Sequence, residues 1–157
     1  MGGIEGARWQ DDEQLHMTLA FAGEVALPQS DDLVEALAEV ESAGFPVEIA
    51  GVGHFERKGT PAAVWARVPL TEPLAQLQRR VERACGRVGL ALEKRVYRPH
   101  ITLARLRSGN PRDIAEYLTV RGGFLEAFPV ERFVLFSARD SVGGGPYVIE
   151  QVYDLAA

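Results

Sequence analysis

One pentapeptide frame, His-apolar-Thr-Leu-Ala, occurs twice in this chain of 157 residues. It begins once at His16 and again at His100, and these are two of only three histidines in the sequence. Successive side chains of a β-strand point to opposite faces, so each copy would place His, Thr and Ala on one face and apolar residues on the other. The repeat therefore predicts two strands that pack one face against a core and present an imidazole beside a hydroxyl.

This pairing of residue types suits acid–base chemistry. An isolated imidazole has a pKa of about 6.5, so neutral and protonated rings are both accessible near neutral pH. Two such rings facing one another across a cleft can act as general base and general acid in one reaction, while threonine hydroxyls donate hydrogen bonds to an oxyanion. We therefore expect His16 and His100 to be catalytic, and Thr18 and Thr102 to bind the substrate.

No metal ion or other cofactor is expected in this site. The two histidines have no carboxylate or thiolate near them at ligand spacing, which makes them a poor set of ligands for zinc or iron. The single cysteine, Cys85, cannot form an internal disulfide and falls inside a predicted helix, where a small buried residue is expected.

The charge balance limits the kinds of partner. A net charge of −5 and an isoelectric point near 5.2 argue against the broad basic surface of a non-specific nucleic-acid binder. Any contact with RNA should therefore be local. Six basic residues and no acidic residue lie between Lys94 and Arg112, which places a field attractive to phosphate around the second histidine motif.

No targeting or membrane signal is recognisable in the sequence. No apolar run approaches the roughly 20 residues of a membrane span, and residues 1–6 do not combine a basic start with an apolar stretch. We expect a monomer in the cytoplasm with no membrane partner.

The order of predicted elements indicates an α+β fold with largely antiparallel sheets flanked by helices. Apolar residues at helical spacing predict helices over 28–44 and 72–88, and a shorter helix after Asn110-Pro111. Period-two and β-branched stretches predict strands over 15–22, 45–55, 63–68, 128–138 and 147–155, and a strand at the second motif. Helices lie between hairpins rather than between every pair of strands, which disfavours a doubly wound parallel sheet.

The two histidine strands open similar strand–helix–strand–strand units. We therefore expect a single domain over 1–157 with two pseudo-symmetric lobes, roughly 7–97 and 98–157, with strand exchange between them and a central cleft that carries both His-x-Thr strands. Gly51 and Gly53 interrupt the strand over 45–55 and indicate a bulge or a close backbone approach. Phe55 and Trp65 are expected in the core, unless one of them stacks a base at the mouth of the cleft.

Five segments carry a resemblance to a known family. They are residues 7–9 (Ala-Arg-Trp), 15–25 with the first His-x-Thr, 51–55 (Gly-Val-Gly-His-Phe), 64–65 (Val-Trp) and 98–105 with the second His-x-Thr. With these motifs the chain resembles the 2H phosphoesterases, and within them the bacterial and archaeal RNA 2′,3′-cyclic phosphodiesterases, or 2′-5′ RNA ligase family. A single His-x-Thr is a weak signal, but the pair in this context is a strong one.

The resemblance implies an activity and roles for residues. It implies metal-independent hydrolysis of RNA or nucleotide 2′,3′-cyclic phosphate ends to 2′-phosphomonoesters, with His16 protonating the departing 3′ oxygen and His100 activating water. It also implies that Arg105 lies close to the phosphate, and that 2′-5′ ligation can occur as the reverse reaction. Strict alternation along the strand would instead place Arg105 on the face of Ile101 and Leu103.

The sequence departs from the family at its start, because family members open with an apolar strand and a helix ahead of the Arg-Trp segment. No counterpart occurs here, so either the chain begins upstream or the first lobe lacks an element. Two other functions stay open at this point: a relative that acts on small cyclic phosphates or 2′-5′-linked oligonucleotides, and a module that binds RNA ends without turnover.

Overall fold

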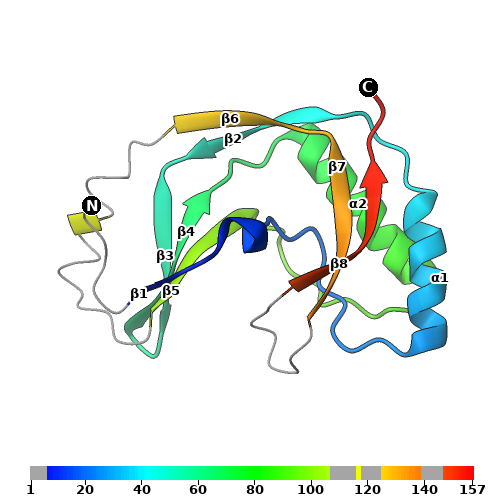
Figure 1. Ribbon diagram of the computed structural model, residues 1–157, viewed down its shortest axis with the longest axis horizontal. Coiled ribbons are helices and arrows are strands. Elements are labelled where there is room, and N and C mark those ends of the chain that lie inside the picture. The colour runs from blue at the N-terminus through cyan, green and yellow to red at the C-terminus, as the bar shows by residue number, and fades with distance from the viewer. Residues whose placement is uncertain (1–6, 107–115, 118–124, 139–146) are drawn as a thin grey trace. The chain divides into compact units, whose positions relative to one another are not determined.

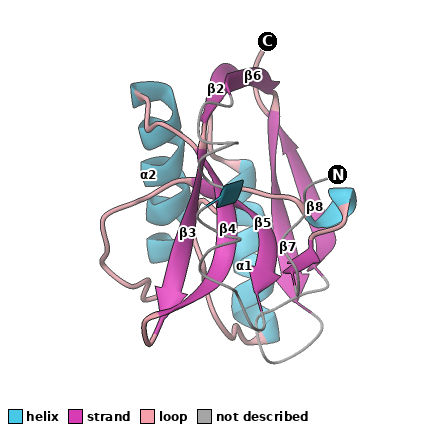
Figure 2. Ribbon diagram, turned by 90° about the vertical axis from the view of Figure 1, so that its left-hand side faces the viewer, coloured by secondary structure: helices cyan, strands magenta, loops and turns pink. Residues whose placement is uncertain are grey.

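The computed structural model describes residues 7–106, 116–117, 125–138 and 147–157, and it confirms an α+β fold with antiparallel sheets and two α-helices (Figures 1 and 2). The strands are β1 (Ala7–Trp9), β2 (Phe45–Ala50), β3 (Val52–Arg57), β4 (Thr60–Arg67), β5 (His100–Leu106), β6 (Leu125–Val130), β7 (Arg132–Ala138) and β8 (Tyr147–Asp154). The helices are the 3-10 turn η1 (Asp12–Gln14), α1 (Leu27–Ala38) and α2 (Glu72–Arg87). The predicted helix after Asn110 lies outside the described residues, apart from Glu116 and Tyr117.

The chain divides into two compact units, each assembled from three segments. The first takes Met1–Thr18, Glu48–Pro69 and Pro99–Ala127, and the second takes Leu19–Val47, Leu70–Arg98 and Phe128–Ala157. Each unit contains residues from before and after residue 97, where the boundary between the two lobes was expected. The division into lobes 7–97 and 98–157 stays a prediction. Both His-x-Thr sequences, residues 16–18 and 100–102, lie in the first unit.

The first unit is built on a four-stranded antiparallel sheet with the order β1-β5-β4-β3. Val64 on β4 and Ala104 on β5 are opposite one another and fully buried. Leu106 joins Val64 in a core cluster, against which Ala7, Leu103 and Tyr117 pack. Apolar side chains therefore cover one face of this sheet, and the other face is left for polar residues.

A two-residue turn joins β3 to β4. Arg57 pairs with Thr60, and the intervening Lys58 and Gly59 have φ values of 53° and 77°. Positive φ at both central residues is the signature of a type I′ turn, whose twist matches that of the flanking strands. Gly59 adopts this conformation readily, whereas Lys58 does so at a cost in free energy.

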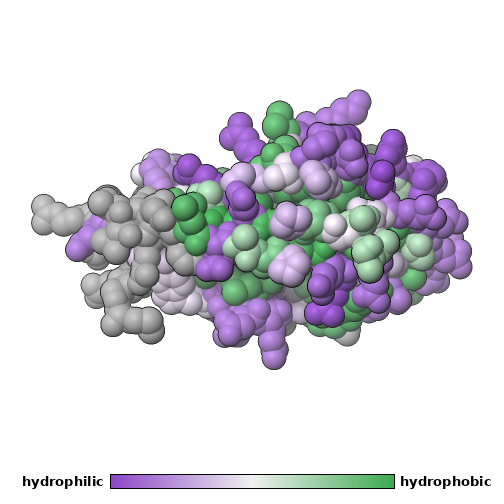
Figure 3. All heavy atoms as spheres, turned by 90° about the horizontal axis from the view of Figure 1, so that it is seen from above, coloured by the Kyte–Doolittle hydropathy of each residue, from purple (hydrophilic) through white to green (hydrophobic). Residues whose placement is uncertain are grey.

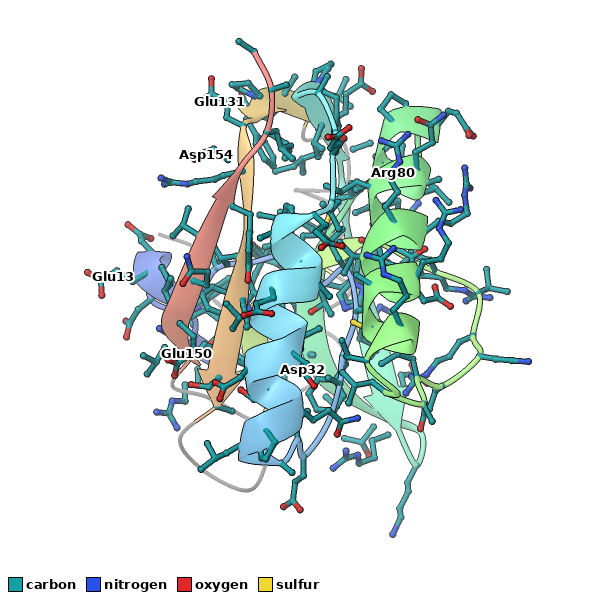
Figure 4. All side chains as sticks on the ribbon, turned by 90° about the vertical axis from the view of Figure 1, so that its right-hand side faces the viewer. Glu13, Asp32, Arg80, Glu131, Glu150 and Asp154 are labelled. Carbon is teal, nitrogen blue, oxygen red and sulfur yellow. The ribbon has the colours of Figure 1, made fainter. Side chains whose placement is uncertain are left out.

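The second unit contains α1, α2 and the antiparallel β7–β8 hairpin. The apolar stripe that predicted α2 is buried, with Leu74 and Leu77 each 1% exposed. The helix ends at Arg87, one residue before the predicted end. Polar contacts tie this unit together: the Gln29 side chain donates to Val88 O (2.9 Å), and Arg80 on α2 donates to Glu41 O (2.7 Å; Figure 4).

Helix α1 is shorter than the sequence predicted, since it ends at Ala38 and not near Gly44. Residues 42–44 instead pair with the C-terminal segment: Ala43 bridges Ala156, Gly44 N donates to Ala156 O (2.9 Å) and Ala156 N donates to Ser42 O (3.0 Å). Backbone groups engaged in this way cannot also extend a helical ladder, so the pairing stops α1 early.

Hydrophilic and apolar side chains are interspersed on the face that Figure 3 draws. Within the described residues, neither α-helix combines the length and the apolar character that crossing a bilayer requires.

Substitution of Lys58 by Asn should stabilise the protein. Asn tolerates the left-handed conformation better than Lys, and Asn-Gly is the preferred type I′ pair. We expect Lys58→Asn to raise the free energy of unfolding by up to about 1 kcal/mol, measured as an upward shift of the urea midpoint. Lys58→Gln removes the same charge without this preference and serves as the matched control; an equal shift in both variants would contradict the turn assignment.

Candidate active site

A single backbone bridge brings the two histidine motifs together. Met17 pairs with Ile101 in an antiparallel sense, on the edge of β5 that β4 does not occupy. An antiparallel register through this bridge sets His16 opposite Thr102, and Thr18 opposite His100. Residues directly opposite one another share a face of the sheet, so the two His-Thr pairs form a four-residue patch, called here the His–Thr quartet.

The two histidines occupy diagonal corners of this quartet. Diagonal neighbours on one face of an antiparallel pair are about 7–8 Å apart, somewhat less between Cβ atoms, which is within the reach of long or aromatic side chains. His16 and His100 are half-buried and Thr18 is exposed. Each imidazole therefore has a threonine directly opposite it and the other imidazole on the diagonal.

The bridge replaces the strand that the sequence predicted over residues 15–22. Only Met17 pairs with β5, and the segment from Leu19 onward belongs to the second unit, where the Gln78 side chain donates to Leu19 O (3.4 Å). The extent of the strand was therefore predicted wrongly, although the pairing of residues around Met17 still gives the expected alternation of faces.

His16 is oriented by its own backbone. The turn η1 ends at Gln14, and Nδ1 of His16 lies 2.8 Å from the Gln14 carbonyl oxygen. A carbonyl oxygen only accepts hydrogen bonds, so Nδ1 carries the proton and the lone pair of the neutral ring is on Nε2. Proton exchange with a substrate would therefore take place at Nε2 of His16.

His100 is held among aromatic rings. Its ring packs edge-on against Phe55, with centroids 5.2 Å apart, and against Trp65, at 5.8 Å. Phe55 and Trp65 also contact one another at 5.3 Å, and the Arg67 guanidinium lies 5.8 Å from the centre of the Trp65 ring. Aromatic pairs favour such tilted, edge-to-face arrangements, so these rings restrict the orientation of the imidazole.

The close backbone approach expected at Gly53 is confirmed. A Cβ atom at Gly53 would lie 2.6 Å from ring atoms of Trp65, so only glycine lets the indole lie across β3. Phe55, in contrast, is 46% exposed rather than in the core. The contacts of both rings with His100 were not predicted from the sequence. Gly53, two residues before Phe55 in the same strand, was a signal that a bulky ring lies close to this face.

A β-bulge decides where Arg105 lies. On β4, Trp65 pairs with Thr102 and the preceding residue, Val64, pairs with Ala104. Leu103 has no partner on β4 and is therefore the extra residue in β5. Beyond this bulge the alternation is reversed: Ala104 meets Val64 on the apolar face and Arg105 meets Ala63. Since residues 63, 65 and 67 alternate onto one face of β4, Arg105 shares the face of the His–Thr quartet, which strict alternation had argued against.

All five residues singled out in the sequence thus lie on one face of one unit. The third histidine does not, because His54 pairs with Val64 on the apolar side of the sheet and contacts Glu56, with Nε2 3.3 Å from Oε1. Among the described residues, no three His, Cys, Asp or Glu side chains gather as a metal site would require.

Comparison with known proteins places this chain in a family. The family model described as "2'-5' RNA ligase superfamily" matches residues 6–141. The chain belongs to the 2′-5′ RNA ligase superfamily. Superfamily relatives include a Thermus thermophilus protein named RNA 2′,3′-cyclic phosphodiesterase, which is 32% identical over 151 residues covering 90% of this chain and 72% of the relative.

Other relatives are longer than the region of similarity. A Geobacillus stearothermophilus protein and an Aeropyrum pernix protein, both named RNA 2′,3′-cyclic phosphodiesterase, are 35% and 37% identical over 82% and 62% of this chain. The chain spans 41% and 56% of their respective lengths.

Solved structures share the fold of this superfamily member. The crystal structure of Escherichia coli LigT complexed with 3′-AMP superposes with a TM-score of 0.77 at 24% identity, covering 98% of this chain and 83% of that one. The crystal structure of the Thermus thermophilus protein TT0787 gives 0.72 at 26% identity, with 96% and 82% covered.

The tautomers of two histidines should differ. In the neutral ring, His16 should carry its proton on Nδ1, because the Gln14 carbonyl accepts there, and His54 should carry it on Nε2, because the Glu56 carboxylate accepts there. Long-range ¹H–¹⁵N correlation spectra above pH ~8 distinguish the two forms. His54 serves as the internal reference, and an Nε2–H tautomer at His16 would contradict the proposed orientation of this ring.

Proposed function

We propose that this chain hydrolyses 2′,3′-cyclic phosphate ends of RNA to 2′-phosphomonoesters by paired-histidine acid–base catalysis. The observation that carries the proposal is the Met17–Ile101 bridge, because its register assembles both His-Thr pairs on one face. The names of the superfamily relatives, RNA 2′,3′-cyclic phosphodiesterase, give the chemistry that such a pair would serve.

In the proposed reaction, water attacks the phosphorus of the cyclic phosphate and the bond from phosphorus to O3′ breaks. His100 in its neutral form removes a proton from the attacking water, and protonated His16 delivers a proton from Nε2 to the departing O3′. The products are a 2′-phosphate and a free 3′-hydroxyl. General acid–base catalysis needs the two rings in opposite protonation states at the start of each turnover.

Charge develops on the non-bridging phosphate oxygens during this reaction. The hydroxyls of Thr18 and Thr102, at the other two corners of the quartet, are placed to donate hydrogen bonds to those oxygens. Arg105 adds a positive charge on the same face. We assign these three residues to substrate binding, with no metal ion required; a cytoplasmic monomer remains our prediction for the working form.

Removal of either catalytic imidazole should reduce turnover strongly. We expect His16→Ala and His100→Ala each to lower kcat for an oligonucleotide 2′,3′-cyclic phosphate by about 10²-fold or more. The matched control is His54→Ala, which removes the third imidazole from the opposite face of the sheet and should leave kcat within a factor of about two. Near-normal turnover in either of the first two variants would refute the mechanism.

The pH dependence and the response to chelators provide an independent test. The rate should fall on both sides of an optimum, since acid protonates the general base and alkali deprotonates the general acid. Incubation with EDTA should leave the rate unchanged. A profile with a single limb would exclude a two-histidine mechanism, and loss of activity in EDTA would indicate a metallohydrolase.

Two outcomes would favour the alternatives. Tight binding of RNA ends without any turnover would indicate a binding module. Turnover of 2′-5′-linked oligonucleotides or of mononucleotide cyclic phosphates in preference to RNA ends would indicate a relative with a different substrate.

A further inference from the structure

Beyond the quartet, the same face of the first unit carries a second concentration of positive charge. Arg8 on β1 pairs directly with Arg105 on β5. Its neighbours on β1 face the other way: Ala7 packs against the Val64–Leu106 core, and the Trp9 ring contacts Tyr117 of the same cluster at 5.7 Å. Arg8 therefore shares the face of Arg105 and of the His–Thr quartet.

This pair of arginines is unusual as a purely structural feature. Like charges directly opposite one another in a sheet are destabilising, and both side chains are exposed. Neither forms an ion pair with a carboxylate among the described residues, where the salt bridges involve other basic groups. Even Glu13, in the turn that follows β1, is exposed and projects outward from η1 (Figure 4).

The charged residues at the described, paired positions of this face have the same sign. This face consists of the quartet and of the paired residues on β1, β3, β4 and β5 that share its side of the sheet. These residues include Arg8, Arg67 and Arg105 and both motif histidines. None of these positions holds Asp or Glu, although the whole chain has a net charge of −5. A local positive surface on an acidic protein favours an anionic ligand at that surface and not elsewhere.

We propose that Arg8, beside Arg105, binds the phosphodiester that precedes the reacting end of an RNA chain. Arg105 is the third residue after Thr102 on β5, so their Cα atoms are at most roughly 10 Å apart. Arg8 lies opposite Arg105 at this distance from the quartet, so Arg105 would contact the reacting phosphate and Arg8 the phosphodiester one nucleotide before it. The proposal rests on the proposed function and narrows its substrate to a chain with at least one internucleotide phosphate, rather than a mononucleotide.

The guanidinium suits this role. It presents a planar fork of donors that matches two phosphate oxygens, and it stays charged at all working pH values. An anion placed between Arg8 and Arg105 would also remove the unfavourable like-charge contact.

The kinetic test compares two substrates that differ by one phosphodiester. The probes are adenosine 2′,3′-cyclic phosphate and the dinucleotide ApA with a 2′,3′-cyclic phosphate end. Arg8→Gln should raise KM for the dinucleotide about 3- to 10-fold with kcat unchanged, and should leave kcat/KM for the mononucleotide within about twofold. Arg8→Lys should recover part of the loss.

The control variant is Arg132→Gln, which removes the same charge from an exposed position on β7, opposite Asp154. It should leave both substrates unaffected. For wild type, the logarithm of kcat/KM for the dinucleotide should fall with the logarithm of salt concentration, and in Arg8→Gln that slope should be shallower by about 0.7.

A binding measurement that needs no turnover tests the role of Arg8 separately from the proposed catalytic function. Calorimetric titration with ApA carrying a 3′-phosphate, against 3′-AMP, should show an advantage for the dinucleotide that Arg8→Gln removes, even if the protein hydrolyses neither cyclic substrate. Equal losses for mono- and dinucleotide would place Arg8 at the reacting phosphate, and no loss for either would leave the two arginines a solvated pair. Both results would overturn the proposal.

Discussion

The pairing of Met17 with Ile101 is the contact on which the candidate site depends. Residues remote in the sequence become neighbours there through the backbone, so the register of two backbone segments sets the geometry of the His–Thr quartet. Once two antiparallel segments are in register, the pleat determines which side chains share a face. A slip of one residue would turn both threonines and both histidines away from one another.

Two segments pair with the same edge of β5 and set this register. Ala7–Trp9 pairs with its C-terminal part, Gln10 N donates to Leu103 O (2.8 Å), and after the short turn η1 the chain returns to pair Met17 with Ile101. The same turn supplies the carbonyl that fixes the ring of His16. One short segment thus anchors the first motif to the second and orients its imidazole.

Much of this architecture was predictable from local patterns. The apolar stripe of α2, the hairpin at Lys58-Gly59 and the face shared by His100 and Thr102 follow from periodicity and from turn chemistry. The close approach at Gly53 also followed, because an unexplained glycine in a strand indicates a nearby backbone or ring. His16 and His100 could be predicted as candidate catalytic residues because two of the three histidines in the chain occur in the same five-residue frame.

The remaining features depend on tertiary pairing that a single strand does not encode. The first motif forms one bridge instead of a full strand, and α1 ends early because residues 42–44 pair with Ala156. The contacts of Phe55 and Trp65 with His100 depend on which strands are neighbours. The side on which Arg105 lies depends on a register shift, and nothing in the sequence His-Ile-Thr-Leu-Ala-Arg distinguishes a bulged strand from a regular one.

The extra residue at Leu103 has a consequence for how this strand can change. Because of this extra residue, the strand places Ala104 in the core and Arg105 on the face of the His–Thr quartet. In a regular strand, each of these two side chains would point to the opposite face. Loss of a single residue here would rotate the strand beyond it by half a turn, directing the guanidinium into apolar packing and the methyl group into solvent. The length of this strand is therefore constrained more tightly than the identity of the side chain that creates the bulge.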